Sequence, residues 1–157
     1  MKYKYNYRTN AFELWQLSMY YIYGSVAGVC NIVFTVAMFA LTVSKWKNLA
    51  EYWHFLMILG CLFFPLIQPL IIYKRVQEQA KNEMQDTEIS FYESGISVSI
   101  GEQNSEIKWN KVKGIIKKPT MLILLSGGKY GFIFSNRVLG SEKEEFYQYV
   151  NSKIAEN

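Results

Sequence analysis

The sequence predicts a membrane α-helical hairpin of two transmembrane helices, followed by a small cytoplasmic α+β domain that contains an antiparallel β-sheet or barrel and a C-terminal helix. Two observations predict this fold class. The chain has no charged residue between Glu13 and Lys45 or between Glu51 and Lys74. After residue 87, apolar residues alternate with polar ones in short runs, as in half-buried strands.

The two predicted transmembrane helices comprise residues 17–43 and 53–73. A hydrocarbon core of about 30 Å needs roughly 20 apolar residues in a helix, and both segments satisfy this length. The first, about 40 Å if helical throughout, is expected to tilt or to begin in the interface near residues 20–23. In the second, Pro65 and Pro69 predict a kink because they remove two backbone donors.

Small and polar residues recur at helical spacing within both spans, and they predict helix packing. The predicted packing residues are Gly24, Gly28, Asn31 and Thr35 in the first span and Cys61 and Gln68 in the second. Two interpretations remain open. Either these faces pack on each other within the hairpin, or Gly24 and Gly28 drive a homodimer or contact another membrane protein.

The flanking basic residues predict the topology. The segments before the first span and after the second carry six Lys and Arg residues, and the short turn between the spans carries two. Cytoplasmic segments are enriched in Lys and Arg. We therefore expect a multi-pass protein of the cell membrane with both termini in the cytoplasm.

The predicted organisation has four parts. Residues 1–8 form a strand that joins the cytoplasmic sheet, residues 14–73 form the hairpin, residues 74–87 form a helical linker and residues 88–157 form the domain. The N-terminal strand is predicted because tyrosines alternate with polar residues in the segment KYKYNYR.

Six further strands are predicted from short runs separated by turn residues. They lie at 88–93, 96–100, 105–110, 112–118, 121–126 and 129–135, and the last two are joined by a Gly-containing turn at 126–128. Ser141 and Glu144 have the spacing of a capping box at the start of a C-terminal helix. That helix has one apolar face, formed by Phe146, Tyr149, Val150 and Ile154. Seven strands and one helix are typical of a pleckstrin-homology-like (PH-like) domain, with the strand order left open.

The order of these parts resembles the YcxB-like family of bacterial membrane proteins. The stretches that carry the resemblance are FYESGISV, SEIKWNKVKGI and YGFIFSNRVLGSEKEEFYQYV. Family members usually have a Pro-Lys-Arg-like step where this chain has Ser135, Asn136 and Arg137, so only Arg137 is retained. The resemblance implies a membrane-anchored domain without an assigned reaction.

The sequence predicts no catalytic residues, no metal site and no cofactor. The single histidine, His54, lies beside Trp53 at the outer interface, where it is expected to act as an anchor, although Glu51 is close enough in sequence for acid–base work. The segment SGGK at 126–129 lacks the spacing of a phosphate-binding loop. We therefore expect a non-enzyme.

A basic stretch is the most suggestive feature for binding. The predicted lipid- or partner-binding residues are Lys108, Lys111, Lys113, Lys117, Lys118 and Arg137, with Lys129 in the same stretch and Trp109 as core support. Anionic lipid attracts such residues by about 1 kcal/mol each near the membrane surface. The alternative is a solvated sheet edge, where lysines prevent edge-to-edge pairing. Nucleic acid is not expected, because the lysines lack interleaved exposed aromatic residues.

Two function classes follow. The first is a membrane-anchored, non-enzymatic binding or regulatory protein whose cytoplasmic domain engages inner-leaflet lipid or a protein partner. The second is an immunity-type membrane protein that protects its producer against a membrane-active toxin or bacteriocin, with Gly24, Gly28 and Asn31 as the contact face.

Overall fold

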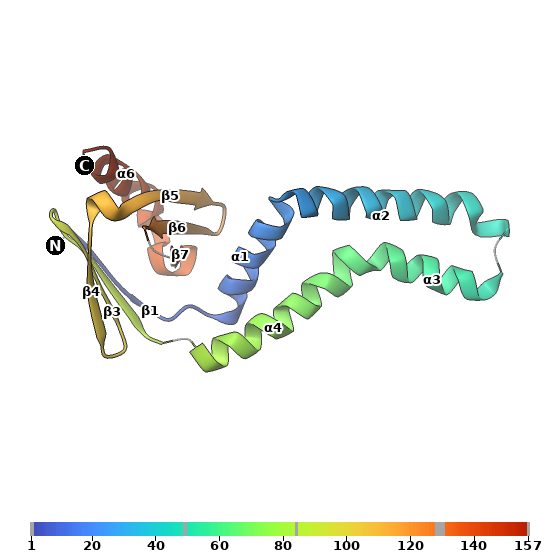
Figure 1. The fold of residues 1–157 in the computed structure, drawn as a ribbon, viewed down its shortest axis with the longest axis horizontal. Helices are drawn as coiled ribbons and strands as arrows, with labels where there is room; N and C mark the ends of the chain where they lie inside the picture. Colours follow the sequence, from blue (N-terminus) through green and yellow to red (C-terminus); the bar gives the residue numbers. More distant parts are fainter. Residues whose placement is uncertain (1, 49, 84, 128–130, 157) are drawn as a thin grey trace. The chain divides into compact units, whose positions relative to one another are not determined.

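The computed structural model describes residues 2–48, 50–83, 85–127 and 131–156, and the chain forms two compact units. One unit combines residues 1–9 with residues 84–157, and it is called the sheet unit below. The other, the helical unit, contains residues 10–83. Figure 1 shows the strands and the C-terminal helix in the first and a long helical hairpin in the second.

The sheet unit contains a four-stranded antiparallel sheet with the order β1-β2-β3-β4. Its strands are β1 (Tyr3–Tyr7), β2 (Thr87–Phe91), β3 (Gly95–Ile100) and β4 (Gln103–Lys108). The N-terminal strand is an edge strand of this sheet, in which Tyr3 lies opposite Phe91 and Tyr7 opposite Thr87. Residues from before the helical hairpin are thus hydrogen-bonded to residues that follow it.

A second antiparallel sheet has the order β5-β6-β7. Its strands are β5 (Val112–Lys118), β6 (Met121–Ser126) and β7 (Gly131–Ser135), and a short helical turn, η3 (Trp109–Lys111), leads into it from β4. In the described part of the chain the seven strands pair as two separate sheets, so the predicted barrel is not closed. The predicted turn at 126–128 and the predicted basic residue Lys129 fall partly or wholly outside the described residues.

An aromatic cluster holds the two sheets and the last helix together. Phe146 of the C-terminal helix α6 (Lys143–Ala155) lies 4.9 Å from Phe91 of β2 between ring centroids, 5.4 Å from Phe134 of β7 and 5.3 Å from Tyr5 of β1. The three phenylalanines are fully buried. Such edge-to-face pairs add about 0.5–1.5 kcal/mol each beyond the apolar area that they bury.

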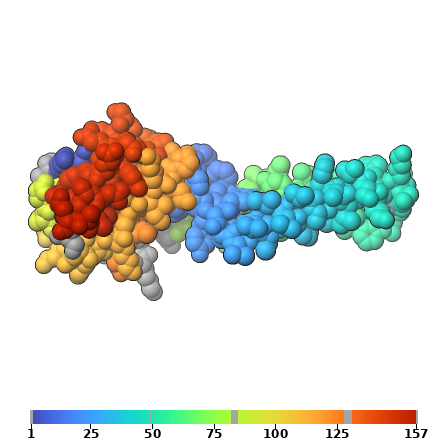
Figure 2. All heavy atoms as spheres, turned by 90° about the horizontal axis from the view of Figure 1, so that it is seen from above, coloured from blue at the N-terminus to red at the C-terminus, as the bar shows by residue number. Residues whose placement is uncertain are grey.

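The helix α6 lies where the predicted C-terminal helix was expected, and Phe146, Tyr149 and Val150 are its buried residues. Figure 2 shows its side chains (dark red) against those of β5 (orange). The predicted capping box at Ser141 and Glu144 is wrong. Two short segments, α5 (Asn136–Leu139) and η4 (Gly140–Glu142), precede α6, so Ser141 lies in a helical turn and Glu144 forms an ion pair with Lys117.

The helical unit begins with two helices where one was predicted. These are α1 (Ala11–Tyr23) and α2 (Val26–Lys45), so the prediction of one continuous helix over residues 17–43 is wrong. The chain changes direction at Gly24 and Ser25, where Ser25 has an extended backbone (φ −105°, ψ 169°) and its hydroxyl donates to the Ile22 carbonyl at 2.6 Å. The Ile22 carbonyl also accepts from the Ser25 N–H at 3.1 Å, so the end of α1 is closed by two bonds from the same residue.

The second arm of the hairpin consists of α3 (Glu51–Leu62), a π-helical turn η2 (Phe63–Ile67) and α4 (Gln68–Glu83), and a short turn η1 (Trp46–Asn48) precedes it. The π-helical turn contains Pro65, which has no N–H to donate, and the Gln68 N–H instead bonds the Phe63 carbonyl. By length and composition, Val26–Asn48 and Glu51–Lys81 are each long and apolar enough to cross a membrane.

We predict that the N-terminal strand depends on the ring of Tyr5 more than on its hydroxyl. The ring is 8% exposed, and the hydroxyl donates to Glu142 at 3.3 Å. Tyr5→Ala should destabilise the sheet unit by about 3–5 kcal/mol because it removes a buried aromatic ring, whereas Tyr5→Phe should cost only about 1 kcal/mol.

Amide hydrogen exchange of β2 in the detergent-solubilised chain measures both effects. Unchanged protection of Ile89 and Phe91 in Tyr5→Ala would contradict the role given to the aromatic cluster.

Candidate functional site

Three of the predicted binding lysines lie together at the passage from β4 to β5. Lys108 ends β4, Lys111 ends η3 and Lys113 lies at the start of β5. All three are exposed, and none forms an ion pair with another residue that the structure describes. We call residues 108–113 the basic segment. Its three side chains are available to an anionic partner.

Trp109 is buried and anchors the basic segment to the core, as the sequence predicted. Its side chain is 2% exposed, and its indole Nε1 donates to the Tyr92 carbonyl at 3.0 Å. The Tyr92 N–H in turn donates to the Gly95 carbonyl at 2.8 Å. These bonds fix the basic segment to the turn between β2 and β3.

The other predicted binding residues have partners within the sheet unit. Lys117 forms an ion pair with Glu144 and lies 5.3 Å from the ring centroid of Tyr147. Arg137 donates from Nη2 to the Arg8 carbonyl at 2.9 Å. Lys117 and Arg137 therefore differ from the three lysines of the basic segment, because their charged groups have partners within the sheet unit.

The strand β5 also separates its two terminal lysines. Successive side chains of a strand point to opposite faces. Lys117, whose ammonium contacts α6, therefore points to the helix side, and Lys118 points to the other side. The Lys118 carbonyl accepts a bond from Lys143 Nζ at 2.8 Å.

Lys143 is a residue that the sequence did not single out. Its ammonium bonds the carbonyls of Lys118 and Pro119, each at 2.8 Å, and so it holds the β5–β6 turn against the start of α6. Burial, followed by the nearby charge of Lys117, lowers the pKa of Lys143 below its usual range. Nothing in the local sequence distinguishes it from the neighbouring lysines.

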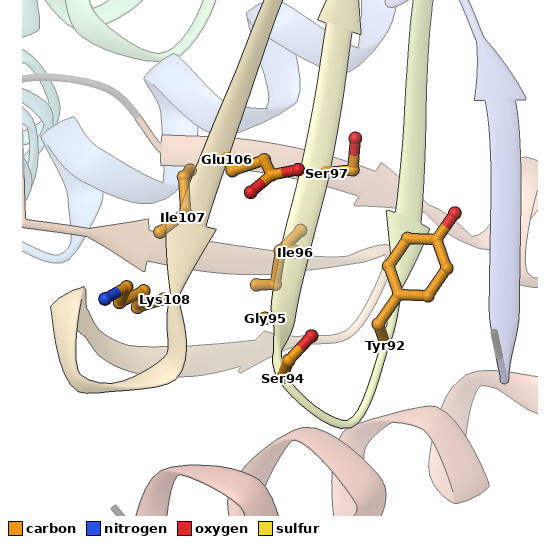
Figure 3. Close-up of a pocket in the computed structure, with 8 residues that line it drawn as sticks. All are labelled: Tyr92, Ser94, Gly95, Ile96, Ser97, Glu106, Ile107 and Lys108. Atoms are coloured by element: carbon orange, nitrogen blue, oxygen red, sulfur yellow. The ribbon is translucent and has the colours of Figure 1, made fainter.

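A hollow of about 260 Å³ lies beside the basic segment, between the ends of β3 and β4. Figure 3 shows Glu106 turned toward Ser97, its partner on β3, while Lys108 points away from both. The strands approach closely here, because a Cβ at Gly95 would lie 2.7 Å from the Ile107 carbonyl oxygen. The hollow offers the carboxylate of Glu106 and the hydroxyls of Ser94 and Ser97 to a polar ligand.

In the helical unit, three side chains of the first arm donate to the second arm around the π-helical turn. Trp15 Nε1 donates to the Pro69 carbonyl at 3.0 Å, and the Tyr23 hydroxyl donates to the Phe64 carbonyl at 3.1 Å. Asn31 Nδ2 donates to Gln68 Oε1 at 3.1 Å. We call these three bonds the polar seam. Only the pair Asn31 and Gln68 was among the residues predicted to pack.

The remaining predicted packing residues occupy different places. Gly24 ends α1, so it does not share a helical face with Gly28, and that prediction is wrong. A Cβ at Gly28 would lie 2.6 Å from Tyr23 Cα, so this glycine permits close approach of α1 to α2. The Thr35 hydroxyl donates to the Asn31 carbonyl of its own helix at 2.8 Å.

Two contacts join α2 and α3 further along the hairpin. The Sγ atom of Cys61 lies 3.5 Å from the hydroxyl of Thr42, and both cysteines are free thiols. Gly60, which was not among the predicted packing residues, faces Met38, because a Cβ there would lie 2.6 Å from Met38 Cε. A glycine within an apolar span was the signal that could have identified this contact.

The histidine of the hairpin turn has a structural partner. His54 Nε2 lies 2.7 Å from the Trp46 carbonyl oxygen, and the two rings are 4.2 Å apart between centroids. Within the described ranges, no group of three His, Cys, Asp or Glu side chains is placed to hold a metal ion. These contacts join α3, which contains His54, to η1, which contains Trp46.

The comparisons with known proteins identify one family. The family model described as YcxB-like protein matches residues 91–150. This match confirms the resemblance predicted from the sequence, and it includes the turn after β2, the basic segment and most of α6. No curated protein and no solved structure matches the chain significantly.

We predict that the Asn31–Gln68 bond stabilises the helical unit only modestly. In a double-mutant cycle with Asn31→Ala and Gln68→Ala, we expect a coupling of about 0.6 kcal/mol and no more than about 1.7 kcal/mol, as for hydrogen bonds between transmembrane helices. The measurement is thermal unfolding in detergent. Thr35→Ala combined with Gln68→Ala is the control and should show no coupling, because Thr35 bonds its own helix. Equal coupling in both cycles would contradict a direct hydrogen bond between Asn31 and Gln68.

Proposed function

Residues 91–150 match the YcxB-like family, and from the exposed apolar helices and the basic segment we propose that the chain is a membrane-anchored, non-enzymatic binding or regulatory protein. The helical hairpin crosses the membrane, and both termini lie in the cytoplasm. The sheet unit is a PH-like domain that contacts the inner leaflet or a protein partner through the basic segment.

The observation that carries this proposal is the exposure of the apolar helices. In the most apolar window of Val26–Asn48, only 6% of the residues are buried. In the corresponding window of Glu51–Lys81, no residue is buried. Val26 is 81% exposed and Phe55 is 70% exposed. Monomeric soluble proteins rarely expose contiguous apolar patches of more than a few hundred Å², whereas lipid covers such a surface.

The length of α2 supports membrane insertion as well. Its 20 residues correspond to about 30 Å, the thickness of the hydrocarbon core. Because the chain breaks at Gly24 and Ser25, α1 is not part of the segment of about 30 Å that crosses the hydrocarbon core. We place α1 and its aromatic residues in the membrane interface.

Pairing of β1 with β2 supports the topology. Tyr3 and Phe91 are strand partners, so the two ends of the helical unit must be on the same side of any membrane that it crosses. An even number of crossings satisfies this, and the excess of basic residues near these ends favours the cytoplasm.

Two sheets of four and three strands with a C-terminal helix support a PH-like assignment for the sheet unit. Within it, the basic segment has three exposed lysines, each attracted to anionic lipid by about 1 kcal/mol near the surface. Protection through the hairpin is not favoured, because Asn31 bonds Gln68 and Gly28 contacts Tyr23 inside the helical unit.

A membrane-impermeant amine reagent applied to intact cells tests the topology. We predict that Lys45 and Lys47 in the turn react, whereas Lys108 and Lys111 react only after permeabilisation. Equal reaction of Lys108 before and after permeabilisation would overturn the cytoplasmic assignment.

Acetylation of the full chain in nanodiscs tests the contact with lipid. We predict that Lys108, Lys111 and Lys113 react about fivefold more slowly in discs that contain phosphatidylglycerol than in phosphatidylcholine discs, which corresponds to about 1 kcal/mol per lysine. High salt should abolish the difference. Equal rates for the basic segment in both lipids would reject inner-leaflet binding and leave a protein partner.

A further inference from the structure

A groove between α1 and α4 has the chemistry of a lipid site. Its volume is about 470 Å³, and its lining comes only from these two helices of the helical unit. Leu17, Tyr21 and Ile22 form the wall on α1, and Ile72, Arg75 and Val76 form the wall on α4. Positions separated by three or four residues share one face of a helix, so each wall is a single helical face.

The lining is mostly apolar, and it also includes Gln79 on α4 and Ser18 on α1, whose hydroxyl donates to the Leu14 carbonyl at 2.9 Å. Val76 is 6% exposed, so the floor of the groove is well covered. Arg75 is exposed, and it forms no ion pair with any side chain that the structure describes. The groove therefore combines a mostly apolar channel with an available guanidinium.

The sequence position of Arg75 indicates how deeply the Arg75 end of the groove lies in the membrane. Residues 52–73 carry no charge, and Lys74 and Arg75 are the first charged residues after them. If this apolar run crosses the membrane, as proposed above, Arg75 lies at the level of the lipid headgroups. A guanidinium there can bind a phosphate with two parallel hydrogen bonds.

We infer that the groove between α1 and α4 binds one anionic glycerophospholipid, with an acyl chain along Leu17, Ile22 and Ile72 and the phosphate on Arg75. In the proposed topology the groove lies between an interfacial helix and the cytoplasmic end of a membrane-crossing helix, at the level where basic residues attract anionic headgroups. The inference rests on the proposed membrane location but not on the basic segment, which belongs to the other unit. It gives the hairpin a specific lipid ligand in addition to its anchoring role.

Native mass spectrometry of the full chain in detergent micelles tests this site. With added phosphatidylglycerol, the chain should retain one lipid with at least about tenfold higher affinity than with added diacylglycerol, which lacks the phosphate, since a hydrogen-bonded charge pair is worth about one to two powers of ten. Arg75→Gln should remove this preference. The matched control, Lys74→Gln, removes a neighbouring cation that does not line the groove, and it should lower the affinity less than Arg75→Gln does.

Two further variants distinguish lipid bound in the groove from lipid bound elsewhere on the chain. Ile72→Trp should fill the groove and displace phosphatidylglycerol while Arg75 remains. The triple change of Lys108, Lys111 and Lys113 to Gln should leave retention intact. Equal affinity for the two lipids, equal effects of Arg75→Gln and Lys74→Gln, or loss of binding in the triple variant would overturn the groove site.

Carbonate extraction of membranes that contain the wild-type chain distinguishes failure of this inference from failure of the proposed function. A chain that resists extraction but shows no dependence on Arg75 overturns the groove site alone. A chain released by carbonate overturns the membrane location itself.

Discussion

The aromatic contact between the first strand and the last helix is the constraint on which the rest of the structure depends. Tyr5, Phe91, Phe134 and Phe146 come from four different elements, the first of which lies before the helical hairpin, and together they form the centre of the sheet unit. Because one of these rings precedes the helical hairpin and the others follow it, the hairpin is an insertion within a single folded unit. The polar seam then joins the two arms of that insertion.

Much of the fold follows from periodicity that is visible in the sequence. Ile96 and Val98 alternate with serines, and both are at most 2% exposed on β3. The boundaries of β5 and β6 coincide with the runs VKGIIKK and MLILLS. These segments were predictable because a half-buried strand imposes a period of two on its own residues. The division of the strands into two sheets was not predictable, because alternation does not specify the neighbours of a strand.

The helical unit shows where local pattern fails. Gly24 and Ser25 fit an apolar helix as well as a break, and the break depends on Gly28, which lets α2 approach the end of α1. Similarly, the partner of Gln68 depends on the π-helical turn at Pro65 and on the register between two arms. Among the lysines, sequence could not distinguish Lys117, which Glu144 neutralises, from Lys113, because the partner comes from a distant helix.

Pairing of the first strand with β2 also imposes an order on biosynthesis. When the residues of β1 leave the ribosome, their hydrogen-bonding partners have not been made, and both arms of the hairpin must be synthesised before Phe91 is available to pair with Tyr3. The tyrosine-rich strand therefore stays unpaired until the hairpin is complete. Completion of the sheet thus requires that the intervening segment has brought the chain back to its first strand.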